Sequence, residues 1–206
     1  MNWPRAPNAR CCGHEPHPGA TSHELLHFAL FGTPIGSCAL VWGVHGLVSV
    51  SLPEAEEATT RRRIAQRFAQ VHETRPSAAL QITMARIKGL LDGAYDDLAD
   101  VPLDMAGVPA FYRRVYDITR SIPPGATLTC GEVAARLGEP HAARAVGQAL
   151  GANPFPIVVP CHRVLAAGGK VGGFSAEGGV RTKLRLLQIE GAPLGGAPGL
   201  FDATVI

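Results

Sequence analysis

The sequence has few charged residues and few cysteines, and each shortage excludes a class of protein. Only 17% of the 206 residues are charged, whereas 46% are hydrophobic, so the chain can bury enough apolar surface to fold and is not intrinsically disordered. The 24 glycines and 17 prolines follow no regular period, which excludes collagen and predicts many turns. The five cysteines are odd in number and irregularly spaced, unlike a disulfide framework.

A secretory signal is also lacking, because the N-terminus has no basic start followed by an apolar core. Together with the cysteine usage, this predicts a cytoplasmic protein, or a nuclear one in a eukaryotic cell. Residues 25–53 contain no Asp, Glu, Lys or Arg, but four glycines, Pro34, His27 and His45 argue against a membrane-spanning helix. We therefore expect no membrane association and predict three strands, His27–Phe31, Ser37–Trp42 and Leu47–Leu52.

Helical patterns follow these strands. We expect Pro53 at a first helical position, with Glu54, Glu56 and Glu57 in the first turn and an arginine run, Arg61–Arg63 and Arg67, further along. This charge order suits the helix dipole, so we interpret the arginines as a solvated helix face and not as a nucleic-acid patch. A second helix is predicted near Ala79–Leu91.

The predicted fold class is α/β, with an N-terminal α/β domain that holds a small sheet and a mainly helical C-terminal domain that contains a helix-turn-helix. We place the domains at residues 23–104 and 105–194, between flexible tails at 1–22 and 195–206. The first tail contains two cysteines and two histidines that could bind zinc, although adjacent cysteines are poorly spaced for tetrahedral ligands. These residues are Cys11, Cys12, His14 and His17.

The helix-turn-helix follows a helix predicted at Pro109–Arg120. Thr129 can cap the next short helix, with Glu132 as its capping-box partner, and a second helix spans His141–Leu150 with Arg144 facing outward. Such hairpins also occur in proteins that bind no DNA. Residues 108–206 carry ten Lys and Arg against six Asp and Glu, which suits DNA but also suits an ordinary solvated surface.

Cys161 is the candidate nucleophile. The apolar run Ile157–Val159 lies between prolines and places Cys161 on a stiff backbone. A reactive thiol needs a base or a positive charge, and His162 is the nearest candidate, either directly or through a water molecule. The alternative is that Cys161 is only a small buried apolar residue.

The segment Pro160–Val164, PCHRV, resembles the acceptor motif of the O6-alkylguanine-DNA alkyltransferases, also called methylated-DNA–protein-cysteine methyltransferases. The resemblance covers residues 109–192 and rests on five ordered matches there, with a further match in the first half. The other matching segments are Ala142–Gly147, Asn153–Pro154, Gly172–Ser175, Leu187–Gly191 and Thr33–Gly36.

The resemblance implies DNA repair by irreversible, single-turnover transfer of the alkyl group of O6-alkylguanine, and of O4-alkylthymine, to Cys161. It implies a monomer without a cofactor that binds double-stranded DNA through the minor groove and flips the damaged base out of the stack. The alternatives are an alkyltransferase-like protein that binds damage without repairing it, and a helix-turn-helix regulator in which Cys161 senses alkylation.

The resemblance also assigns roles to residues. Cys161 would accept the alkyl group, His162 would act as base through a water, Glu190 would orient His162, and Asn153 would hold the active-site turn. The implied substrate pocket comprises Cys130, Pro156, Val164, Phe174 and Ser175. The implied DNA-binding residues are Tyr112, Gly131, Ala142, Ala143 and Arg144, with Arg144 entering the stack in place of the flipped base.

This sequence departs from the family pattern at a few positions. Cys130 and Phe174 stand where tyrosines are common, and the Cys130 thiol is a shorter and weaker proton donor for the leaving guanine than a phenol. Gly43 and Val48 occupy the positions of zinc ligands in vertebrate members, so we expect no structural zinc.

Overall fold

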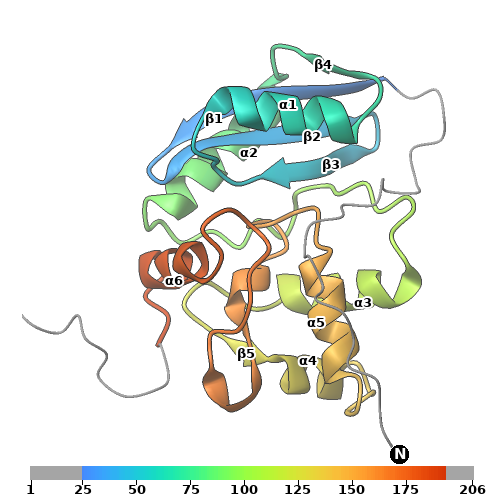
Figure 1. The fold of residues 1–206 in the computed structure, drawn as a ribbon, viewed down its shortest axis with the longest axis vertical. Helices are drawn as coiled ribbons and strands as arrows, with labels where there is room; N and C mark the ends of the chain where they lie inside the picture. Colours follow the sequence, from blue (N-terminus) through green and yellow to red (C-terminus); the bar gives the residue numbers. More distant parts are fainter. Residues whose placement is uncertain (1–24, 194–206) are drawn as a thin grey trace, which may run out of the picture.

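The computed structural model describes residues 25–193 and has a sheet layer above a cluster of helices (Figure 1). The sheet begins with the strands β1 (Leu26–Thr33), β2 (Gly36–Gly43) and β3 (Gly46–Ser51), which pair as successive antiparallel hairpins. The three predicted strands are therefore confirmed, and β1 is longer at both ends than its pattern indicated.

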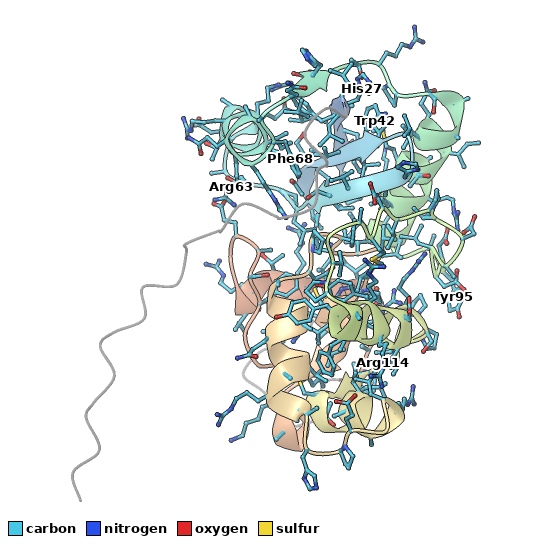
Figure 2. All side chains as sticks on the ribbon, turned by 90° about the vertical axis from the view of Figure 1, so that its right-hand side faces the viewer. His27, Trp42, Arg63, Phe68, Tyr95 and Arg114 are labelled. Carbon is cyan, nitrogen blue, oxygen red and sulfur yellow. The ribbon has the colours of Figure 1, made fainter. Side chains whose placement is uncertain are left out.

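A fourth strand, β4 (Val71–Glu73), pairs in parallel with β1 and gives the sheet the order β3-β2-β1-β4. It was not predicted, since three residues are too few to show alternation. Helix α1 (Glu57–Arg67) precedes β4 and helix α2 (Ala78–Leu91) follows it. The two views place α1 and α2 on opposite faces of the sheet (Figures 1 and 2).

The sheet residues divide between these two faces as strand alternation requires. Phe28 and its cross-strand partner Val41 pack in one cluster with Ile64 and Phe68 of α1 and its C-cap. The neighbouring partners Ala29 and Leu40 belong to the larger cluster that includes α2. That cluster continues into the helices of the C-terminal half, so the two halves share one apolar core.

Helix α1 starts at Glu57, so the expectation of Pro53 at a first helical position was wrong. Pro53 instead packs on the β1–β2 turn, where a Cβ added to Gly36 would lie 2.8 Å from the Pro53 Cβ. Glu54 lies before the helix with its side chain only 5% exposed, paired with Arg63. These long-range contacts hold the segment between β3 and α1 out of the helix.

The C-terminal half has four α-helices and a short parallel ladder among its described residues. The helices are α3 (Ala110–Arg120), α4 (Cys130–Arg136), α5 (Ala143–Gly151) and α6 (Val180–Ile189). The ladder joins β5 (Leu128–Thr129) to β6 (Val164–Leu165), and two 3₁₀ turns lie at Cys161–Arg163 (η1) and Ala167–Gly169 (η2).

The predicted capping box is present at the start of α4, where Thr129 accepts from the Glu132 N–H and Glu132 accepts from the Thr129 N–H. Helices α4 and α5 pack together as the predicted helix pair, although α5 starts two residues later than expected, with Ala142 as its N-cap. The predicted fold class is therefore confirmed. The domain boundary near residue 104 remains a prediction.

Backbone hydrogen bonds join β3 to both the connecting segment and the C-terminal half. The Leu47 N–H donates to the Pro102 carbonyl at 2.9 Å, and the Val50 N–H donates to the Pro154 carbonyl at 2.8 Å. The Ser49 hydroxyl donates to the same Pro154 carbonyl at 3.2 Å. The sheet edge thus fixes the loop that leads to Cys161.

Some predictions concern residues that the structure does not describe. The tails at 1–22 and 195–206, with Cys11, Cys12, His14 and His17, lie outside the described residues. Within residues 25–193, no helix has both the length and the apolar character needed to cross a membrane.

Candidate active site

Cys161 lies at the start of η1, at the end of a turn that the Asn153 side chain stabilises through two hydrogen bonds. The Asn153 amide Nδ2 donates to the Val159 carbonyl at 2.9 Å, and its Oδ1 accepts from the Phe155 N–H at 3.0 Å. Ile157, inside this turn, has φ = 75°, a left-handed conformation that β-branched residues rarely adopt. The turn is therefore fixed by hydrogen bonds and buried apolar side chains, and it keeps Cys161 buried.

The residues after Cys161 converge on one carboxylate from the end of α6. Glu190, the α6 C-cap, lies 2.9 Å from His162 Nε2 through its Oε1. Arg163 donates to both Glu190 oxygens, from Nε at 2.9 Å and from Nη2 at 2.8 Å, and its Nη1 donates to the Ile122 carbonyl at 2.6 Å. All three side chains are almost fully buried, so this is a desolvated, charge-neutralised network.

Electrostatics define the protonation states in this network. Burial alone raises the pKa of Glu190, but hydrogen bonds from His162 and Arg163 outweigh it and hold the pKa at about 2. Burial lowers the pKa of His162, so the imidazole is neutral near pH 7 and donates its Nε2 hydrogen to Glu190. His162 Nδ1 is buried, has no hydrogen-bond partner in the described structure, and keeps a lone pair that can accept a proton.

The Cys161 sulfur is protonated at rest. Burial raises the pKa of Cys161, while the Asn153 side chain and the charge of Lys183 act in the opposite direction. Lys183 is buried on α6, and its Nζ donates to the Val164 carbonyl at 2.6 Å. The thiol must therefore lose its proton before it can act as a nucleophile.

Arg163 and Lys183 were counted in the sequence only as part of a basic surplus, yet both are buried beside Cys161. Helical periodicity contained a signal for Lys183, because Lys183, Leu186 and Leu187 lie at i, i+3 and i+4 on the buried face of α6. For Arg163, the signal in the sequence is its position directly after Cys161 and His162. That position alone does not show that the side chain is buried.

A pocket opens beside Cys161 and brings together several of the predicted residues. Cys161, Asn153, Pro156, Phe174 and Ser175 line it together. Cys130 and Val164, also predicted for the substrate pocket, do not line it: Cys130 is half-buried at the start of α4, and Val164 is buried in β6. The opposite wall was not predicted and comes from the sheet layer, at residues 50–52, Glu54, Arg63 and Arg67.

The predicted DNA-binding residues lie on the helix pair and on α3. Arg144 and Gly131 are exposed on α5 and α4, while Ala142 and Ala143 are half-buried at the start of α5. Tyr112 is half-buried on α3, with its ring 6.4 Å from both the Phe111 and the Tyr116 rings. Among residues 25–193, no group of three or more His, Cys, Asp and Glu side chains could hold a metal ion.

Residues 110–192 match the family model described as "6-O-methylguanine DNA methyltransferase, DNA binding domain". A methylated-DNA–protein-cysteine methyltransferase of Methanothermobacter thermautotrophicus is 37% identical over 79% of this chain and 84% of the relative. One from Mycobacterium bovis is 35% identical over 86% of this chain and 100% of the relative.

The fold agrees with these sequence matches. A crystal structure described as "Mycobacterium tuberculosis OGT in complex with DNA" superposes with a TM-score of 0.64 at 32% identity, over 81% of this chain and 95% of the other. The chain belongs to the methylated-DNA–protein-cysteine methyltransferase family of enzymes, which confirms the class indicated by the PCHRV resemblance.

The Glu190 network predicts a specific stability profile. Because the folded-state pKa of about 2 lies below the ordinary value of 4.5, ionised Glu190 stabilises the fold above pH 4.5, and this contribution disappears as pH falls toward 2. We expect Glu190→Gln to lower the free energy of unfolding at pH 7 by about 3–5 kcal/mol, since it leaves Arg163 buried without its counter-charge. Urea unfolding between pH 7 and pH 3 measures this loss.

The difference between wild type and Glu190→Gln should narrow as the pH falls below 4.5. Glu139→Gln is the matched control, because Glu139 forms an exposed ion pair with Arg114 and its loss should cost less than about 1 kcal/mol. A Glu190→Gln cost as small as that of the control would contradict the network.

Proposed function

We propose that this protein repairs double-stranded DNA by transferring the alkyl group of O6-alkylguanine, and of O4-alkylthymine, to its own Cys161. The observation that supports this most directly is a pocket-lining thiol followed in the chain by a buried histidine whose Nδ1 has no hydrogen-bond partner in the described structure. His162 is held through Nε2 by Glu190, which leaves Nδ1 free to accept the thiol proton, directly or through a water molecule.

The proposed reaction is a single displacement. The Cys161 sulfur, once deprotonated, attacks the alkyl carbon, an S–C bond forms, and the O6–C bond breaks with its electron pair moving into the guanine. The guanine takes up one proton, which balances the proton lost by the thiol. A thioether has no easy route back to a thiol, so each molecule reacts once and needs no cofactor.

DNA recognition is assigned to the helix pair α4–α5. The exposed Arg144 lies near the start of α5 next to small residues, and such a surface fits a narrow groove. We propose that α5 enters the minor groove of DNA as part of a monomer and that Arg144 fills the gap left by the flipped base. We propose that the protein acts on this substrate in the cytoplasm, or in the nucleus of a eukaryotic cell.

The direct test is to incubate the protein with duplex DNA that contains O6-methylguanine and to digest it for peptide mass spectrometry. We expect the mass of one added CH₂ group on the peptide that contains Cys161, and no such addition in Cys161→Ala. Cys38→Ala serves as the control, because Cys38 is buried in the sheet and should be dispensable for transfer. Tight binding without methyl on Cys161 would instead indicate a damage-binding protein.

The role of Arg144 can be separated from the chemistry. We expect Arg144→Ala to slow repair of O6-methylguanine in duplex DNA by about tenfold or more, because base flipping loses its stacking replacement, while reaction with the free base O6-benzylguanine changes little. Single-turnover rates on the two substrates measure this. Arg62→Ala on α1 is the control, and equal losses on both substrates for Arg144→Ala would refute the proposed role.

A substitution at Cys130 tests the effect of having a cysteine where tyrosine is common in the family. Burial raises the pKa of the Cys130 thiol, so it is neutral and can serve only as a weak hydrogen-bond donor. We expect Cys130→Tyr to increase the single-turnover rate more than it strengthens DNA binding, measured by quench-flow and fluorescence anisotropy. An unchanged rate would show that another group donates the proton to the leaving guanine.

A further inference from the structure

The pocket beside Cys161 extends to a wall that belongs to the other half of the molecule. Leu52, Glu54, Arg63 and Arg67, from the end of β3 to the end of α1, line the same pocket as Cys161. Figure 2 shows Arg63 at the lower end of the sheet layer, above the orange-red segments of the C-terminal half. The sequence pattern predicted only a solvated helix face here, which is wrong for Arg67, since its half-buried side chain lines the pocket.

The charges of this wall are unevenly paired. Glu54 has a buried carboxylate whose charge is taken by Arg63, and its Oε2 has no hydrogen-bond partner in the described structure. Arg67 has its guanidinium carbon 5.3 Å from the centroid of the Phe68 ring, but forms no hydrogen bond or ion pair within residues 25–193. Burial alone lowers the pKa of Arg67. The other carboxylate that lines the pocket, Glu177, belongs to an exposed residue.

A partly desolvated guanidinium without an anion is an incomplete site. Its planar donors fit a carboxylate, which they can bind through two parallel hydrogen bonds. The Glu54–Arg63 pair next to it is already neutral and Glu177 is an exposed residue, so Arg67 carries the partly buried charge of the lining that has no counter-ion in the described structure.

We propose that Arg67 is a specificity-determining residue that fits the pocket to O6 substituents ending in a carboxylate, such as carboxymethyl. This inference rests on the proposed function of Cys161. Of the residues expected to contact the base, Ser175 lines the pocket, whereas Cys130 and Val164 do not. The pocket continues from Ser175 and Cys161 to the sheet layer, so the part of the substituent beyond the transferred carbon would extend in that direction, and Arg67 would contact its far end.

For such a substrate, the same bonds form and break and the same proton moves as in methyl transfer. The Cys161 sulfur forms a bond to the methylene carbon of the O–CH₂–COO⁻ group, the O6–C bond breaks, and the guanine takes up one proton. The product is S-carboxymethylcysteine, whose carboxylate stays in the pocket. A methyl substituent has no atoms beyond the transferred carbon, so it cannot contact Arg67.

The experiment compares single-turnover rates on three duplexes that differ only in the O6 substituent: methyl, propyl and carboxymethyl. Propyl supplies the length without the charge. We expect Arg67→Gln to slow carboxymethyl transfer by about tenfold or more, because a charge-assisted hydrogen bond is lost, and to change methyl and propyl transfer less than about twofold. Arg62→Gln, on the same helix but away from the pocket, should leave all three rates unchanged.

Arg67→Met, which keeps the apolar stem, and Arg67→Lys, which keeps the charge, separate recognition from folding. We expect Arg67→Met to lose carboxymethyl selectivity as Arg67→Gln does, and Arg67→Lys to retain part of it, with thermal unfolding measured for each. Equal losses on all three substrates, or no loss on carboxymethyl, would overturn the proposal. A wild-type protein that transfers no methyl to Cys161 would instead refute the proposed function.

Discussion

The active site depends on the buried carboxylate of Glu190. This group neutralises Arg163 through two hydrogen bonds and orients His162 through a third, so one side chain sets both the charge balance and the imidazole orientation. Arg163 extends the link to the Ile122 carbonyl, just after α3. The end of α6, the 3₁₀ turn at Cys161 and the end of α3 are therefore held together by ionic hydrogen bonds between buried side chains, where each bond is strong and each unpaired group is costly.

The same burial keeps the Cys161 thiol protonated at rest. The pKa of the Cys161 thiol is raised by burial, and the neutral His162 beside it does not supply the positive charge that would favour a thiolate. In the proposed reaction, the thiol would then lose its proton to the Nδ1 lone pair of His162, directly or through a water molecule. A thiol of this kind is protected from general oxidation and alkylation in solution, because it is both protonated and covered.

Local patterns predicted the elements and the centre of the site, and failed where distant segments decide the outcome. A stretch without charged residues, interrupted by turn residues, predicted β1 to β3, and the Thr129–Glu132 pair predicted the start of α4, since both signals depend on neighbouring residues. The start of α1 was wrong because Pro53 is held by the β1–β2 turn, and β4 is too short to show a period. Cys161, His162 and Glu190 were predicted from sequence motifs. Arg67 lines the pocket because the N-terminal half of the chain packs against the C-terminal half, and no local sequence pattern predicts that packing.

The hydrogen bond from the Val50 N–H to the Pro154 carbonyl has a further consequence for the sheet. Strand β3 is an edge of that sheet, and its outward N–H groups at Leu47 and Val50 are bonded to Pro102 and Pro154. The other edge, β4, is only three residues long, and two of them are exposed and polar. An unprotected edge strand is a template for pairing with other chains. The connecting segment at Pro102 and the loop that leads to Cys161 therefore also cover this edge against self-association, and an N-terminal fragment without them would expose it.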